Sequence, residues 1–218
     1  MIDSYEKLTI GKYLEIKAIL EDTGEEIDKN VQLICCLGDY DEETVLDLPL
    51  SGFNRLLQGT AFLTETPKQR QVSTKYKLGG MELETVMDVT SMTTAQFIDY
   101  QTFVKDDRYL VELLSVFLIP KGKKYNKGYN IIDVQKVIRD NLSILDAMAL
   151  SAFFLAWFQA LSQATVTCLT KKMKKMLKKE KDMEKRKMME EAIMNLERSG
   201  DGLALLTEYQ RLSGNLGV

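Results

Sequence analysis

The feature that most constrains this chain is a stretch of 24 residues, Ala147 to Thr170, that carries no charged side chain. Residues 171–187 follow it with ten Lys and Arg against three Asp and Glu, a local balance of +7. Because the formal net charge of the whole chain is −3, the residues outside that run together carry −10. An apolar helix that continues into a basic helix, attached to an acidic remainder, favours a protein that docks onto a partner protein, a membrane or nucleic acid.

The spacing of apolar residues predicts a mostly helical, α+β fold. Residues 8–63 repeat apolar side chains at intervals of three and four, as short helices do. Residues 93–118 resume this pattern after Thr93 or Thr94, either of which can cap a helix N-terminus. Only three prolines occur in 218 residues, which also suits helices because proline interrupts them.

A β-hairpin is expected near residues 69–88, between the two helical regions. Gly79 and Gly80 separate two runs of alternating residues, and glycine readily adopts the positive φ that a tight hairpin turn needs. A lone hairpin is marginally stable in water, so we expect it to pack on helices or on another chain. The side chains expected to share a face within each strand are Val72, Thr74, Tyr76 and Leu78 in the first, and Met81, Leu83, Thr85 and Met87 in the second.

The C-terminal part is expected to be a long helical region. No strong helix breaker occurs from Ser143 to about Arg198, so a continuous or once-kinked helix of about 80 Å is predicted. A short amphipathic helix at 203–212 is expected after it. The predicted organisation is therefore a helical domain with an inserted hairpin at 1–142 and a long apolar-then-basic region at 143–218.

The uncharged stretch 147–170 has two competing interpretations. It is long enough to cross a bilayer, which needs about 20 apolar residues, and its basic flank would lie on the cytoplasmic side. A polar stripe instead favours a helix buried in a protein core or an oligomer, and we expect that burial. The stripe comprises Gln159, Ser162, Gln163 and Thr170, and the opposite side carries Phe154, Trp157, Phe158, Leu161 and Cys168.

Catalytic chemistry is not indicated by the sequence. The chain contains no histidine, which is the commonest general acid or base at neutral pH and the commonest metal ligand. The acidic run Asp39–Glu43 lacks the glycine and the ligand alternation of a calcium loop, so we expect a solvated helix start. Cys35, Cys36 and Cys168 lack metal-ligand spacing and are expected to be buried. We therefore expect no enzyme, no cofactor and no metal site.

Two lysine-rich segments are candidate partner-binding sites. Residues 119–129 form a loop by their Pro, Gly and Asn content, and its tyrosines are expected to pin it to the domain. The basic run carries methionines at helical spacing, which is typical of an adaptable interaction surface. The candidate residues are Lys121, Lys123, Lys124, Tyr125, Lys127, Tyr129, Lys171, Lys172, Lys174, Lys175, Lys178 and Lys179.

The loop segment 115–129 with the helix that carries Phe153 and Phe154 resembles virion and tail-assembly proteins of crAss-like and related tailed phages of gut bacteria. The segments Leu8–Ile16 and Glu43–Leu50 are similar to such proteins too, the second to tail-assembly chaperones. The resemblance implies a virion structural or tail-morphogenesis protein that acts by protein–protein contact.

Its expected partners are other virion or tail proteins and further copies of itself. Two alternatives stay open: a membrane-active or ejected virion protein that uses 147–170, and a nucleic-acid-associated protein that uses 171–187. The N-terminus, MIDSYEKLTIGK, lacks the basic and apolar segments of a signal peptide. The expected location is the virion or the host cytoplasm during assembly, and secretion is not expected.

Overall fold

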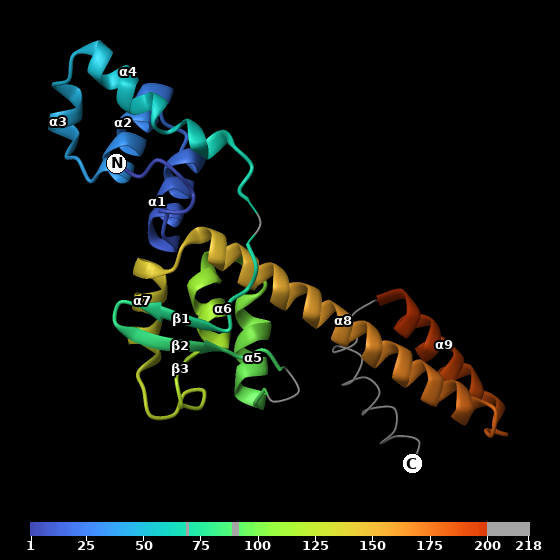
Figure 1. Cartoon of the computed structure of the whole chain (residues 1–218). Coiled ribbons are helices and arrows are strands. Elements are labelled where there is room, and N and C mark those ends of the chain that lie inside the picture. Colours follow the sequence, from blue (N-terminus) through green and yellow to red (C-terminus); the bar gives the residue numbers. More distant parts are fainter. Residues whose placement is uncertain (69, 89–91, 200–218) are drawn as a thin grey trace. The chain divides into compact units, whose positions relative to one another are not determined.

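The computed structural model of the chain describes residues 1–68, 70–88 and 92–199 (Figure 1). It confirms a mostly helical chain with a small antiparallel sheet and a long helix near the C-terminus. The chain divides into two compact units, Met1–Ser151 and Ala152–Val218, whereas the sequence suggested a division after residue 142. Each unit is described by itself below.

The first unit opens with four helices: α1 (Ile10–Glu21), α2 (Glu26–Gly38), α3 (Glu42–Leu46) and α4 (Leu50–Gln58), followed by a 3₁₀ turn, η1 (Ala61–Thr64). Thr9 caps α1 and Asp41 caps α3, each accepting a hydrogen bond from a backbone N–H three residues on. Helices α2, α3 and α4 form a small core of their own. It consists of Val31, Ile34 and Val45, with Cys35, Phe53, Leu56 and Leu57 packed against it.

A three-stranded antiparallel sheet follows, with the order β1 (Lys75–Leu78), β2 (Met81–Thr85), β3 (Leu118–Pro120). The hairpin between β1 and β2 is confirmed, and its turn residues Gly79 and Gly80 have φ of +52° and +82°. One face of the hairpin is buried, but Thr74 and Met87, which the prediction placed on that face, are exposed and lie beyond the ends of the strands. The buried side chains of the hairpin are Tyr76, Leu78, Leu83 and Thr85.

The third strand, β3, corrects the sequence analysis, which assigned 119–129 to a loop throughout. Its pairing aligns Leu83 with Pro120 and Thr85 with Leu118. The strand forms because Leu118 and Ile119, which follow α6, are buried beside β2, where their backbone groups require hydrogen-bond partners. The hairpin therefore packs within its own chain.

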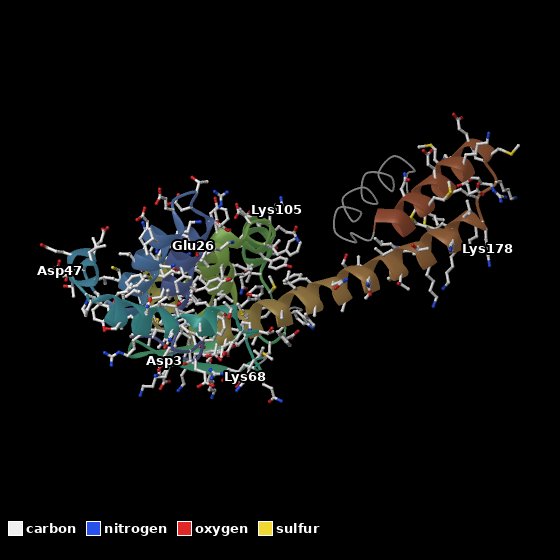
Figure 2. The ribbon with its side chains drawn as sticks, turned by 90° about the horizontal axis from the view of Figure 1, so that it is seen from above. Asp3, Glu26, Asp47, Lys68, Lys105 and Lys178 are labelled. Carbon is white, nitrogen blue, oxygen red and sulfur yellow. The ribbon has the colours of Figure 1, made fainter. Side chains whose placement is uncertain are left out.

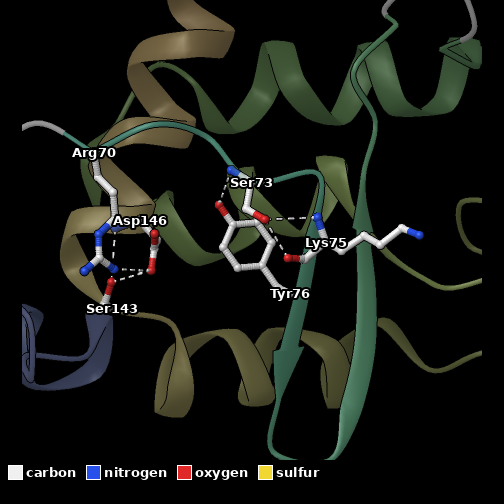
Figure 3. A network of polar contacts seen from close by, with 6 residues as sticks. All are labelled: Arg70, Ser73, Lys75, Tyr76, Ser143 and Asp146. Carbon is white, nitrogen blue, oxygen red and sulfur yellow. Dashed lines mark hydrogen bonds and ion pairs between the residues drawn. The ribbon is translucent and has the colours of Figure 1, made fainter.

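On each outer strand of this sheet, some of the outward backbone groups are already hydrogen-bonded or are missing. On β1, the Lys75 N–H donates to the Ser73 hydroxyl at 3.3 Å, and that hydroxyl donates to the Lys75 carbonyl at 2.7 Å. Figure 3 shows these contacts, together with the Ser73 N–H that donates to the Tyr76 hydroxyl. On β3, the Leu118 N–H bonds to the Leu114 carbonyl in the preceding helix, and Pro120 has no N–H. Free edges of this kind would otherwise invite pairing with another chain.

Three helices pack beside the sheet: α5 (Thr94–Phe103), α6 (Leu110–Phe117), which follows the 3₁₀ turn η3 (Asp107–Tyr109), and α7 (Ile131–Asn141). Thr93 caps α5 in a capping box with Gln96, as one of the two sequence alternatives predicted. The buried Gln96 side chain also donates to the Val116 carbonyl at 3.1 Å, which joins α5 to the end of α6. Polar groups therefore fix the way these helices pack.

The two ends of the first unit meet through backbone hydrogen bonds. The Ile10 N–H donates to the Leu142 carbonyl at 3.1 Å, and the Ile144 N–H donates to the Leu8 carbonyl at 2.8 Å. All four of these side chains are fully buried. This pairing attaches the N-terminal helices to the start of the long helix α8 (Ile144–Leu177).

The start of α8 is fixed by a polar cluster. The Ser143 hydroxyl accepts from the Asp146 N–H at 3.1 Å and donates to the Asp146 carboxylate at 2.6 Å, as at a helix N-cap. Arg70 forms an ion pair with the same carboxylate at 3.1 Å (Figure 3). The segment that leads into β1 is thereby tied to the first turn of α8.

The second unit is a helical hairpin, which corrects the expected continuous or once-kinked helix. α8 ends at Leu177, a turn follows, and α9 (Met183–Ser199) packs back on it. Met173 and Ile193 are buried between the two helices, and Leu169, Leu177 and Ala192 pack around them. The basic run therefore occupies the end of α8, the turn and the start of α9. The short helix expected at 203–212 lies outside the described residues.

Candidate interaction surfaces

The lysine loop, residues 119–129, is anchored by its tyrosines as expected. Tyr125 is buried, and its hydroxyl donates to the Asp99 carboxylate of α5 at 2.7 Å. Burial, followed by this contact with a carboxylate, raises the pKa of Tyr125 above its ordinary value. The half-buried Tyr129 accepts from the Asn126 N–H at 3.2 Å, and burial raises its pKa too. The loop is therefore an ordered structure.

The loop presents its lysines in two ways. Lys121 forms an exposed ion pair with Glu82 of β2 at 2.8 Å, so it is engaged within the sheet. Lys123, Lys124 and Lys127 are exposed. Positive φ at Gly122, Asn126 and Gly128 gives the backbone the tight turns that place these side chains around the loop.

The six candidate lysines from 171 to 179 are all exposed, at the end of α8 and in the turn that follows. Figure 2 shows Lys178 pointing away from the ribbon there. Met173 lies among them and points the other way, into the hairpin core. The helix is thus cationic outside and apolar inside. Lysines near a helix C-terminus also interact favourably with the helix dipole.

Ten of the 23 side chains that the structure describes in the uncharged part of α8 are exposed and only five are buried, so burial within one chain does not account for this stretch. In this stretch, buried positions include Ala147, Leu150, Phe154, Phe158 and Thr170. A long exposed side remains, which we call the uncharged face. It consists of Ala152, Leu155, Ala156, Gln159, Ala160, Gln163, Ala164, Thr167 and Cys168.

Two expectations from the sequence are corrected here: the position of the polar stripe on α8 and the burial of the cysteines. Gln159 and Gln163 share the exposed side with alanines, while Thr170 of the same predicted stripe is buried. The three cysteines are not buried as expected, because Cys168 is exposed and Cys35 and Cys36 are half-buried. α8 is also long and apolar enough to cross a bilayer, and 35% of its most apolar stretch is buried within the chain.

Reactive groups are sparse in the part of the chain that the structure describes. No group of three or more His, Cys, Asp or Glu there could hold a metal ion. Cys36 donates from its thiol to Glu15 at 3.5 Å, and burial raises the pKa of this thiol to about 11. It therefore stays protonated at neutral pH, which makes it a poor nucleophile.

Sequence reasoning missed an acidic and apolar surface on the N-terminal helices. Residues 1–65 contain fourteen Asp and Glu against five Lys and Arg, and Figure 2 labels Glu26 and Asp47 among them. Leu46 and Leu50, which we call the leucine pair, are 63% and 75% exposed within this acidic region. Counting the charges of residues 1–65 separately would have revealed this surface, because the net charge of the whole chain includes the basic run and hides the acidic excess.

Comparison with known proteins gave no match: no protein family, no curated protein and no solved structure is similar to this chain. The arrangement of its surfaces is therefore the basis for assigning a role.

Proposed function

We propose that this chain is a virion structural or tail-morphogenesis protein of a tailed phage and that it works by protein–protein contact. The resemblance described above, which covers most of residues 8–160, supports the phage assignment. The observation that carries the contact mechanism is the uncharged face of α8, which is exposed over about five turns of a single helix.

The composition of this face suits a protein partner. Leu155 is 50% exposed and supplies apolar area, while alanines at positions 152, 156, 160 and 164 leave room for a second helix to approach. Gln159 and Gln163 offer donors and acceptors for a partner that excludes water. Protein interfaces commonly have such an apolar centre and a charged rim, which the lysines from 171 onward supply here.

Particle composition tests the phage assignment. Quantitative mass spectrometry of purified particles from the encoding phage should detect the chain at a fixed copy number per particle. A morphogenesis factor that leaves before maturation should instead be found in assembly intermediates. Absence from both, with assembly unaffected when the gene is deleted, contradicts the proposal.

The uncharged face is tested with Ala156→Glu combined with Ala160→Glu. Both side chains are exposed, so the fold should persist while a buried interface would contain two unpaired charges. We expect incorporation or assembly to fall at least about tenfold, which is the scale of losing one strong interface contact. Ala95→Glu, at an exposed position on α5, is the matched control and should assemble normally.

A membrane-active protein is the second candidate, and the length of α8 favours it. Flotation of the purified chain with anionic vesicles distinguishes the two. Vesicle binding that survives high salt, and that the two glutamates abolish, supports the membrane function. Recovery of the chain in the lipid-free fraction supports protein contact.

A further inference from the structure

Two exposed surfaces of this chain lie in segments of opposite charge, the acidic residues 1–65 and the basic residues 171–187, and each exposes apolar side chains. One is the leucine pair on the acidic N-terminal helices. The other is the tip of the α8–α9 hairpin, which we define as Lys178, Lys179, Lys181 and Met183.

The leucine pair is exposed for a structural reason. α3 is only five residues long, and its Val45 is directed into the small core with Val31 and Ile34. Successive helix residues point about 100° apart, so Leu46 turns away from that core. Leu50 is the first residue of α4, after Pro49.

Acidic side chains surround the leucine pair in the sequence. Glu42, Glu43 and Asp47 are all exposed, and all three lie within eight residues of Leu50. An apolar patch with a rim of one charge favours a partner with an apolar centre and the opposite charge.

The hairpin tip has an apolar centre and lies within the basic run 171–187, whose balance is +7, with Glu180, Asp182 and Glu184 alternating with its lysines. Met183 opens α9 and is 76% exposed, next to three exposed lysines in and beside the turn. On α9, Met189 and Ile193 are buried, while Lys187 and Met194 follow Met183 on the outward side. Methionine is flexible enough to fit an irregular apolar patch.

We propose that the hairpin tip of one copy docks on the leucine pair of a second copy. The exposed methionine covers the leucines, and the lysines of the tip meet the acidic rim. The two contacting surfaces differ, so the contact is heterologous and each copy offers one surface of each kind. Repeated docking produces a ring or an open chain. This inference rests on the proposed function, since it names a second copy as one of the partners.

The test uses sedimentation velocity with the full chain and two variants. The tip variant carries Lys178→Glu, Lys179→Glu and Met183→Ser, and the leucine variant carries Leu46→Ser and Leu50→Ser. Wild type should form species larger than a dimer at low salt, whereas each variant alone stays monomeric. An equimolar mixture of the two should form a dimer and grow no further, because the tip variant keeps its leucine pair and the leucine variant keeps its tip.

Matched controls are available on the same chain. Ile98→Ser with Ile132→Ser removes two leucine-sized side chains that are 57% and 67% exposed elsewhere, and it should assemble like wild type. Lys123→Glu with Lys124→Glu reverses two exposed loop charges and should also assemble. Circular dichroism melts of each variant verify folding. In the tip variant, the further changes Glu42→Lys and Glu43→Lys should restore assembly into larger species if folding is intact.

Several results would overturn the docking. They are a monomeric wild type at low salt, growth of both variants alone, and a mixture that stays monomeric. Docking of the tip within its own chain would keep wild type monomeric, and so would a tip occupied by DNA that displaces the second copy. If the sedimentation test fails while the chain is present in particles, only the docking is contradicted. If the chain is absent from particles and from assembly intermediates, the proposed function itself is contradicted.

Discussion

At the residue scale, the lysine loop shows what sequence composition can and cannot predict. The Pro, Gly, Asn and Lys content predicted a loop, and the tyrosines were expected to anchor it. The partner of Tyr125 could not be predicted, because Asp99 lies 26 residues away on α5 and meets the hydroxyl only through the packing of the domain.

Removing the Tyr125 hydroxyl should weaken this anchor. Tyr125→Phe keeps the buried ring but loses the bond to a carboxylate, so we expect the free energy of unfolding to fall by about 1.5–3 kcal/mol. Urea unfolding measures this loss. Tyr129→Phe is the control, and it should cost less because its hydroxyl accepts only from a backbone N–H. Equal effects of the two substitutions would argue against the Asp99 contact.

Cysteine reactivity should follow the exposure of each thiol and the raised pKa of Cys36. A pKa near 11 leaves about a hundredfold less thiolate at pH 8 than the ordinary pKa of 9.0 does, and the thiolate is the reactive form. We expect maleimide to modify the exposed Cys168 first and Cys36 much later, with the Cys36 rate rising as the pH approaches 11. Mass spectrometry of timed samples measures the order in which the cysteines are modified. In the unfolded chain this difference in rate should disappear.

At the element scale, helix identity was predictable and helix ends were only partly so. Thr93 was one of two predicted caps because capping depends on neighbouring residues. The turn after Leu177 contains neither Gly nor Pro, and its local signal is Asp182, whose carboxylate accepts from the Glu184 and Lys185 N–H groups at the start of α9. It forms where Met173 can pack against Ile193, which is a tertiary effect. β3 was missed for a similar reason, because its three residues include a proline and its strand partner lies far away in the sequence.

The hairpin should depend strongly on one methionine. Met173 is 5% exposed, so Met173→Ala leaves a cavity and should cost about 2–5 kcal/mol. Because the core shared by α8 and α9 is small, we expect faster amide hydrogen exchange throughout α9 while β2 and α6 keep their protection. Met188→Ala, at an exposed neighbouring position, should leave the exchange unchanged. Equal loss of protection in the first unit would show that the two units unfold together.

At the scale of the whole molecule, opposite charges are segregated along the chain. The sequence already separated a basic run from an acidic remainder. It could not locate the leucine pair, since Leu46 and Val45 look equally suited to a core until α2 and α4 pack around one of them. It also could not say which side of α8 would be left uncovered, because that depends on which other segments pack on the helix.

This segregation should be measurable despite the net charge of −3. At low salt and neutral pH we expect the full chain to bind a cation exchanger through its hairpin and to elute as salt screens the contact. Lys171→Ser, Lys175→Ser and Lys178→Ser together should move elution to clearly lower salt. The same change at Lys123, Lys124 and Lys127 should have a smaller effect. Passage of wild type straight through the column would contradict this.

The blocked sheet edges also limit how copies of this protein can aggregate. With the Lys75 backbone groups held by Ser73, and with no free N–H at Leu118 or Pro120, fewer backbone groups at the sheet edges can bond to an added strand. Growth into cross-β fibrils, which requires strand upon strand, is thereby disfavoured from the native state. Copies of this chain can then reach a high local concentration and bind one another through helices, while their sheets do not add strands from a neighbouring copy.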